Sequence, residues 1–161
     1  MLTQEENELL TRVGPGTRMG ALLRHYWQPV AGVAEMADRW TMRVRILDED
    51  LVVFRARGGQ FGLIAEACPH RAASLAYGIP TEDGIRCPYH GWLYDVEGRC
   101  LDTPCEPADS TFRTRVLHGA YPVRDVSGFV FAYIGPKPVP EFPKYDMLFM
   151  EGVDKVVQGR D

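Results

Sequence analysis

Residues 68–71 read Cys-Pro-His-Arg and residues 87–92 read Cys-Pro-Tyr-His-Gly-Trp, and these two stretches are the most specific pattern in the chain. Each joins a cysteine to a histidine two or three positions later, and 16 residues separate the first histidine from the second cysteine. The proline after each cysteine disfavours helical dihedrals, so both pairs belong to stiff loops. Two thiolates and two imidazoles at one point suit a binuclear iron–sulfur centre. We therefore expect the metal ligands to be Cys68, His70, Cys87 and His90.

These stretches resemble the Rieske [2Fe-2S] proteins, whose pattern is Cys-x-His, a gap of similar length, and Cys-x-x-His. Within that family they are most similar to the Rieske domain of aromatic-ring-hydroxylating oxygenases of the phthalate dioxygenase type. The similarity also covers residues 7–17, 26–30 and 94–98, and so extends over about the first 145 residues. By the family's pattern, the two cysteines hold a buried iron and the two histidines hold an outer, more exposed iron.

The residues that border the ligands also have expected roles. Gly91 would let the backbone approach the cluster or adopt a positive φ. Trp92 and Tyr89 would shield the cluster from water and so tune its potential. Tyr94 matches a family tyrosine that can donate to a cysteine sulfur. Arg71 would either help to dock an acidic face of a partner or pair with a local carboxylate.

Two features separate this chain from the Rieske proteins of respiratory complexes. Those proteins join an extra cysteine in each loop by a disulfide, whereas here the two positions read Ala73 and Tyr89. They also place a serine near a bridging sulfide, where this chain has Trp92. Fewer hydrogen bonds to sulfur stabilise the oxidised cluster, so we expect a potential near the low end of the Rieske range. Many relatives have glycine in place of Ala72; if that position needs a positive φ, the loop is strained or shaped differently there.

Two other uses of the cysteines stay open. Disulfides are disfavoured because the N-terminal residues lack the basic and apolar regions of a secretory signal, which indicates a reducing, cytoplasmic location. A structural zinc site is the stronger alternative, since two cysteines and two histidines fit a tetrahedral ion, although zinc fingers do not use mixed Cys/His pairs. The pattern leaves out several residues that we expect to be ordinary thiols and structural or solvated imidazoles: Cys100, Cys105, His25 and His118.

Composition excludes several classes of protein. The 161 residues, 45% hydrophobic and 25% charged, suit one globular domain with a sizeable core. No apolar run approaches the ~18 residues of a membrane helix, so we expect no membrane partner. The net charge of −4, from 22 acidic and 18 basic side chains, argues against nucleic-acid binding.

Turn signals at short intervals separate segments that favour β-strands. The expected strands are residues 42–47, 51–57, 61–66, 121–125 and 129–134, with a turn at residues 48–50 between the first two. Further hairpin signals are Asp83-Gly84, Glu97-Gly98 and Ser127-Gly128. We therefore predict an all-β chain: a Rieske-type antiparallel β-sandwich with a cluster-binding subdomain of two hairpin loops, plus short N-terminal helices.

Helix is expected mainly at the start of the chain. Thr3 and Glu6 form a capping box for a helix that ends near Gly14, and a second short helix is expected over residues 17–24.

The C-terminal part changes character. Residues 136–143 hold four prolines and are typical of a linker or a surface strap, whereas residues 147–150 are apolar and need something to pack on. We therefore expect a Rieske domain over residues 1–145, with its cluster-binding loops at about 66–95. Residues 146–161 would be the start of a missing catalytic domain or a C-terminal tail.

The resemblance implies electron transfer as the function. In such oxygenases of aromatic hydrocarbon catabolism, the N-terminal Rieske domain passes electrons from a flavin-containing reductase or a ferredoxin to a mononuclear Fe(II) in the catalytic domain of a neighbouring subunit. This chain cannot supply that second iron site, because only His25 and His118 remain and no acidic residue stands in the family's spacing with a histidine pair. No catalytic residue is therefore expected. A free-standing Rieske ferredoxin and a zinc-stabilised binding module stay open as alternatives.

Overall fold

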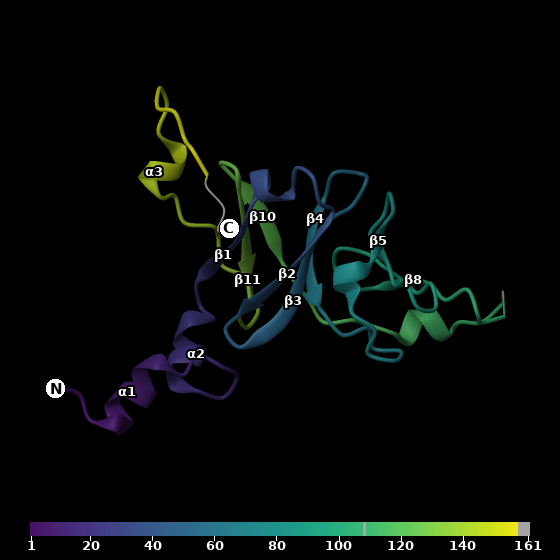
Figure 1. The fold of residues 1–161 in the computed structure, drawn as a ribbon, viewed down its shortest axis with the longest axis horizontal. Helices are drawn as coiled ribbons and strands as arrows, with labels where there is room; N and C mark the ends of the chain where they lie inside the picture. Colours follow the sequence, from purple (N-terminus) through teal and green to yellow (C-terminus); the bar gives the residue numbers. More distant parts are fainter. Residues whose placement is uncertain (108, 158–161) are drawn as a thin grey trace.

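β3 (Glu49–Arg55) lies at the centre of the molecule and is buried on both of its faces. Leu51 and Val53 pack into one hydrophobic core, whereas Val52 and Phe54 pack into another. This alternation follows from the pleat of a strand, in which successive side chains point to opposite faces. The computed structural model, which describes residues 1–107 and 109–157, therefore has layers on both sides of β3 (Figure 1).

The sheet that contains β3 has four antiparallel strands in the order β2-β3-β4-β9. Its other members are β2 (Thr41–Ile46), β4 (Phe61–Ala65) and β9 (Ala120–Tyr121). β3 occupies an inner position of this sheet, and its apolar run Leu-Val-Val-Phe is therefore shielded from water along its edges as well as on its faces.

The turn between β2 and β3 differs from the turn expected at residues 48–50. Glu49 and Asp50 already belong to β3 and pair with residues of β2. The turn is the dipeptide Leu47–Asp48, in which both residues have positive φ, 49° and 66°. A two-residue turn of this kind matches the right-handed twist of paired strands, so the second strand begins at once.

A three-stranded antiparallel sheet in the order β1-β11-β10 packs on one face of the first sheet. Its strands are β1 (Trp27–Gly32), β10 (Val123–Val126) and β11 (Phe129–Tyr133). The predicted turn at Ser127-Gly128 is confirmed, because β10 and β11 pair on either side of it. The sandwich core between the two sheets includes Leu63, Val130 and Ala132, all fully buried.

A small sheet of four short strands, in the order β5-β6-β7-β8, packs on the other face of β3. Its strands are β5 (Ile79–Pro80), β6 (Ile85–Arg86), β7 (Leu93–Tyr94) and β8 (Cys100–Asp102). The hairpins predicted at Asp83-Gly84 and Glu97-Gly98 are confirmed by the pairing of these strands. The core between this sheet and β3, here called the cysteine core, includes Val52, Phe54, Ile64, Leu75, Ile85, Trp92, Tyr94, Cys68, Cys87 and Cys100.

The outer face of the three-stranded sheet is covered by the C-terminal strap, residues 136–150. Phe142 lies with its ring centroid 5.6 Å from that of Trp27 and 4.9 Å from that of Phe131. Leu148 joins the same cluster, so the apolar tail packs on this sheet. Of the two uses expected for the proline-rich segment, the structure shows a surface strap.

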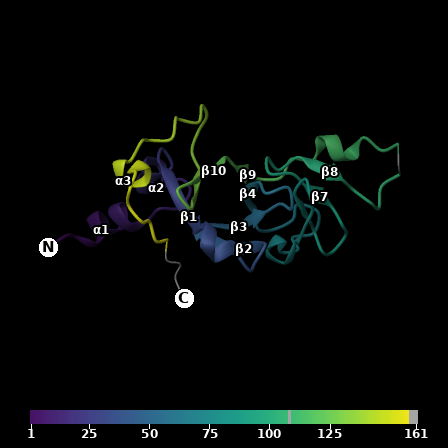
Figure 2. The ribbon, with the colours of Figure 1, turned by 90° about the horizontal axis from the view of Figure 1, so that it is seen from above.

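The α-helices of the molecule are short and lie at one end of it (Figure 1). α1 (Gln4–Thr11) begins at the predicted capping box: Glu6 N donates to Thr3 Oγ1 at 3.2 Å, and Thr3 N donates to Glu6 Oε2 at 2.8 Å. The other helices are α2 (Arg18–Leu23), η1 (Val33–Met36), η2 (Leu75–Tyr77), η3 (Phe112–Arg115) and α3 (Asp146–Phe149). Figures 1 and 2 agree in placing α1 and α3 at one end and β8 at the other.

The predicted fold class is confirmed, since two antiparallel sheets form the sandwich and the small sheet carries hairpin loops. Among residues 1–107 and 109–157, no helix is both long and apolar enough to cross a bilayer.

We expect Phe142→Ala to lower the free energy of unfolding by about 3 kcal/mol and to release the C-terminal strap, because the strap loses its largest buried side chain. Limited trypsin digestion after Lys144 measures the release. Met147→Ala, at a side chain that is 73% exposed, is the control and should leave stability and cleavage unchanged. Equal cleavage of Phe142→Ala and the parent would show that this ring does not hold the strap.

Candidate metal centre

The first ligand loop, residues 67–74, is a tight turn closed by two backbone hydrogen bonds. Cys68 N donates to Ala73 O at 2.9 Å, and Ala72 N donates to Cys68 O at 2.8 Å. Ala72 has a φ of 55°, in the left-handed region. An alanine there costs roughly 1–2 kcal/mol, because its Cβ approaches a carbonyl oxygen. The strain that the sequence predicts for a positive φ at this position is therefore present.

The second ligand loop, residues 87–92, repeats the same backbone turn. Cys87 N donates to Trp92 O at 2.8 Å, and Gly91 N donates to Cys87 O at 3.0 Å. Gly91 has a φ of 75°, so it occupies the position that Ala72 occupies in the first loop. A Cβ on Gly91 would also lie 3.2 Å from Pro104 Cγ, which leaves little room for a side chain.

The two loops bring their cysteines together inside the cysteine core. Cys68 and Cys87 are each 2% exposed. Burial raises the pKa of the Cys87 thiol, and the neighbouring Cys68 raises it further. Backbone N–H groups of Tyr89 and His90 donate to the Cys87 sulfur and oppose this rise. A metal that binds this sulfur must therefore displace a proton, and the two N–H groups are already placed to stabilise the thiolate.

The two histidines of the loops lie side by side nearer the surface. The ring centroids of His70 and His90 are 4.6 Å apart, and both residues are half-buried. The His70 ring stacks on the Trp92 indole at 4.5 Å, with an angle of 2° between the planes. Desolvation lowers the pKa of His90, and the charges of His70 and Arg71 lower it further. His90 is thus held in the neutral form that binds a metal.

A tyrosine closes the buried side of the centre. Tyr94 Oη lies 3.3 Å from Cys68 Sγ, and Tyr94 is fully buried. Burial raises the pKa of Tyr94 and the nearby Cys68 raises it further, so the hydroxyl keeps its proton and donates when Cys68 is a thiolate. His118 packs against Tyr94 at 5.1 Å between ring centroids, and its Nε2 donates to Ala65 O at 2.7 Å. Burial lowers the pKa of His118, which serves as a neutral structural side chain.

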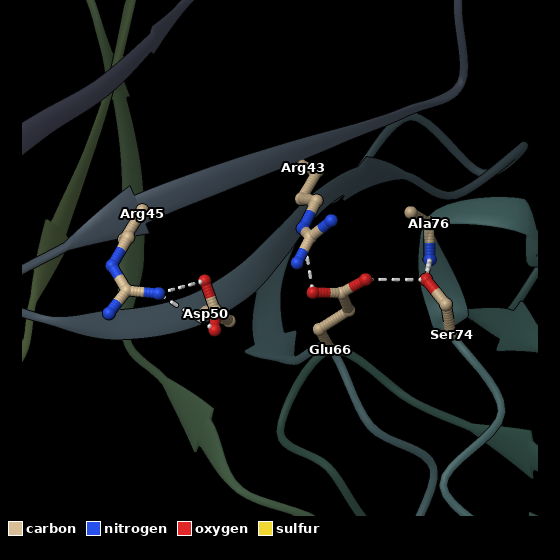
Figure 3. A network of polar contacts seen from close by, with 6 residues as sticks. All are labelled: Arg43, Arg45, Asp50, Glu66, Ser74 and Ala76. Carbon is tan, nitrogen blue, oxygen red and sulfur yellow. Dashed lines mark hydrogen bonds and ion pairs between the residues drawn. The ribbon is translucent and has the colours of Figure 1, made fainter.

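An acidic side chain at the end of β4 braces the first ligand loop. Glu66 accepts a hydrogen bond from Ser74 Oγ at 2.7 Å and pairs with Arg43 Nε at 2.8 Å (Figure 3). Ser74 in turn accepts from Ala76 N at 3.3 Å, at the start of η2. The loop is thus tied at both ends to the sandwich.

An arginine braces the second ligand loop. Arg86 Nη1 donates to Gly91 O at 2.5 Å and to Asp102 Oδ2 at 2.9 Å. The sequence does not predict either brace, because a charged residue on a short strand carries no local signal of its partner. The nearest available signal is that Arg86 directly precedes Cys87.

The remaining neighbours of the ligands differ in exposure. Trp92 is 7% exposed and packs between His70 and Phe112. Tyr89 contacts His90 at 3.8 Å between ring centroids and is itself 61% exposed, so it lies at the rim of the site. Its shielding of the cluster stays a prediction. Of its neighbours in the loop, Cys87 is buried, His90 is half-buried, and Tyr89 is left on the outside. Arg71 is exposed beside His70, and the ion pairs found among the described residues do not include it.

The other cysteines lie outside the ligand set. Cys100 is buried opposite Tyr94 on the paired strand β8, and Cys105 is exposed. All four cysteines of the chain are free, so the thiols of the two loops are available to a metal.

The four candidate ligands form two pairs at different depths. A fully buried pair of thiols beside a half-exposed pair of imidazoles fits the donor set of a binuclear iron–sulfur centre, with one iron on each pair. Within residues 1–107 and 109–157, no three His, Cys, Asp or Glu side chains are grouped so that they could hold a single metal ion.

A profile of the Rieske [2Fe-2S] domain matches residues 26–128, which is more than half of the chain and includes both ligand loops. The chain belongs to the Rieske [2Fe-2S] domain family. The cofactor predicted from the paired Cys/His loops is therefore confirmed as the Rieske [2Fe-2S] cluster.

Similar proteins are oxygenase subunits, as the sequence predicts. The 5,5'-dehydrodivanillate O-demethylase oxygenase subunit of Sphingobium sp. is 44% identical over 149 residues, or 91% of this chain and 35% of that protein. The phthalate 4,5-dioxygenase oxygenase subunit of Pseudomonas putida is 46% identical over 145 residues, or 88% of this chain and 33% of that protein.

Solved structures agree with these relatives. A chain from the reduced complex between oxygenase and ferredoxin in carbazole 1,9a-dioxygenase has a TM-score of 0.62 and 31% identity, covering 73% of this chain and 30% of that chain. The Rieske chain described here thus spans about a third of the length of the relatives it matches.

We expect Ala72→Gly to stabilise the cluster-loaded protein by about 1 kcal/mol, because glycine removes the cost of a Cβ at positive φ. Thermal unfolding, followed by the loss of visible absorption, should shift upward by about 3 °C. Ala67→Gly, in the same loop but at ordinary φ, is the control and should lower the midpoint. A lower midpoint for Ala72→Gly as well would mean that the loop does not hold this conformation.

Proposed function

We propose that this Rieske domain transfers single electrons through a [2Fe-2S] cluster held by Cys68, His70, Cys87 and His90. The observation that carries the proposal is the depth of the two pairs: both thiols are 2% exposed, whereas both imidazoles reach toward the surface. When bound, the cluster accepts and releases one electron. The cysteines anchor it in a dry environment, and the histidines present the face that a redox partner can approach.

The residues around the ligands support this role. Tyr94 and the N–H groups of the second loop offer hydrogen bonds to sulfur, which stabilise negative charge and so favour the reduced state. Trp92 excludes water from one side of His70. Arg71 is exposed beside the histidines, where it is suited to dock an acidic face of a partner.

We propose that this chain is the N-terminal part of an oxygenase component. A flavin-containing reductase or a ferredoxin would supply electrons, and a mononuclear non-haem iron in a catalytic domain would accept them. The oxygenase names of the relatives support this assignment, and so does the coverage of only about a third of their length. Residues 1–145 would be the Rieske domain and residues 146–161 the connection to the catalytic domain.

The arrangement of the ends supports an acceptor in a neighbouring subunit. α3 lies at one end of the molecule, whereas β8 and the ligand loops of the same subdomain lie at the other (Figures 1 and 2). A domain that continued from the strap would therefore begin at the end of the molecule opposite the subdomain that carries the ligand loops. A reducing, cytoplasmic location is part of the same proposal, because the two ligand cysteines must stay reduced until metal binds.

A free-standing Rieske ferredoxin remains the alternative, since the described residues form a complete sandwich with its own cluster subdomain. The two possibilities differ in one observation, namely whether the coding frame continues past Asp161 into a second domain.

We expect the purified protein to contain about two irons and two acid-labile sulfides per chain, to absorb visible light, and to show an EPR signal after reduction. Metal analysis and both spectra measure this directly. A colourless, EPR-silent protein that holds one zinc per chain would refute the function and favour the zinc-stabilised binding module.

The ligand assignment makes a separate prediction. His90→Cys replaces a neutral imidazole by an anionic thiolate, so the reduction potential of a variant that retains its cluster should fall. Redox titration followed by visible absorption measures the change. His25→Cys, at an exposed histidine outside the loops, is the control and should leave the potential unchanged. An unchanged potential for His90→Cys would mean that His90 is not a ligand.

A further inference from the structure

Arg86 contacts the second ligand loop from the strand that precedes it. It is the last residue of β6, and it directly precedes Cys87. Its Nη1 donates to Gly91 O at 2.5 Å, so the guanidinium bridges the base of the loop from the cysteine side to the residue after His90. The backbone turn does not need a charged side chain here, because hydrogen bonds of the Cys87 backbone N–H and C=O already close it.

Asp102 holds this arginine in place. It lies on β8, opposite Leu93 of β7, and its Oδ2 accepts from Arg86 Nη1 at 2.9 Å. Two residues later, Pro104 also lies against Gly91, where a Cβ would meet Pro104 Cγ at 3.2 Å and Arg86 Nη1 at 3.7 Å. The turn after His90 is therefore contacted by both the charged pair and a proline ring.

The exposure of the pair matters for its electrostatic effect. The side chains of Arg86 and Asp102 are 31% and 41% exposed, and those of Arg45 and Asp50, which form an ion pair on the β2–β3 hairpin (Figure 3), are 61% and 43% exposed. Arg86 is therefore the less exposed of the two arginines, whereas the two carboxylates are similar. Water screens a partly buried charge less than an exposed one. The loop that Arg86 contacts also carries two of the four candidate ligands. Arg86 and Asp102 are thus placed to act on the centre by charge as well as by position.

We propose that the Arg86–Asp102 pair sets the reduction potential of this domain through two opposing contributions. Reduction adds one negative charge to the centre. The guanidinium stabilises that charge and raises the potential, whereas the carboxylate destabilises it and lowers the potential. Both are positioning residues, since neither is a ligand, and the hydrogen bond to Gly91 O fixes how close the positive charge lies. The inference rests on the proposed electron-transfer function.

Two variants that replace a charged side chain by a neutral one test the direction of each contribution to the reduction potential. In the cluster-loaded protein, Arg86→Gln should lower the potential and Asp102→Asn should raise it. Each change should alter the ratio of reduced to oxidised protein at a fixed electrode potential by about ten-fold. Both shifts should shrink in high salt, because screening weakens them. The double variant should return toward the parent, and Arg86→Lys, which keeps the charge, should stay closer to the parent than Arg86→Gln. Redox titration at constant pH measures all four.

A merely structural brace predicts a different pattern. Loss of either partner would then loosen the same contact with Gly91 O, so both single variants would shift the potential in the same direction, and that result overturns the proposal. Unchanged potentials overturn it as well. If Arg86→Gln does not retain a cluster, Asp102→Asn decides alone: an upward shift supports the proposal, and no shift or a downward shift refutes it.

Arg45→Gln is the matched control, because it removes the same charge from an ion pair on the β2–β3 hairpin, and it should not change the potential. Failure of the proposed function is distinguishable from failure of this inference. A parent without the iron–sulfur absorption and EPR signal refutes the function, whereas a normal parent with the wrong shifts refutes only the role of Arg86 and Asp102.

Discussion

β3 is buried on both of its faces and so links the two hydrophobic cores of the domain. Leu51 and Val53 belong to the sandwich core, and Val52 and Phe54 belong to the cysteine core. Because side chains alternate along a strand, a shift of one residue in its register would exchange the two sets. The same strand therefore specifies how the sandwich packs and where the small sheet with the ligand loops is seated. The buried side of the site thus packs on the central sheet of the domain.

The two ligand loops use the same backbone turn to direct a cysteine and a histidine toward one site. Each turn requires a residue at positive φ after the ligands, and the chain uses Gly91 in one loop and Ala72 in the other. Each loop also needs an anchor outside itself, which is Glu66 for the first and Arg86 for the second. The turn orients a cysteine inward and a histidine outward, and the anchor fixes the turn relative to the sheets. The turn and the anchor together explain why the four candidate ligand side chains converge.

Features with a local cause could be predicted from the sequence, and features that depend on tertiary contacts could not. The paired Cys/His spacing, the Thr3 capping box and the Ser127-Gly128 turn each lie within a few residues and were found at the predicted places. The β2–β3 turn was misplaced because neither residue of Leu47–Asp48 is a glycine, although both adopt positive φ. The ion pairs Arg43–Glu66 and Arg86–Asp102 join residues on different strands, so their charges gave no indication of the partners.

The difference in depth between thiols and imidazoles makes the site directional. Tyr94 and His118 close the sulfur side, and β3 lies behind them, so a partner has no approach from that direction. The imidazole side is bordered by exposed Tyr89 and Arg71. The strap packs on the opposite end of the stack of sheets, beyond two hydrophobic cores. The histidines and the strap are therefore separated by the stack of sheets, so contact with a redox partner at the histidines need not disturb the packing of the strap.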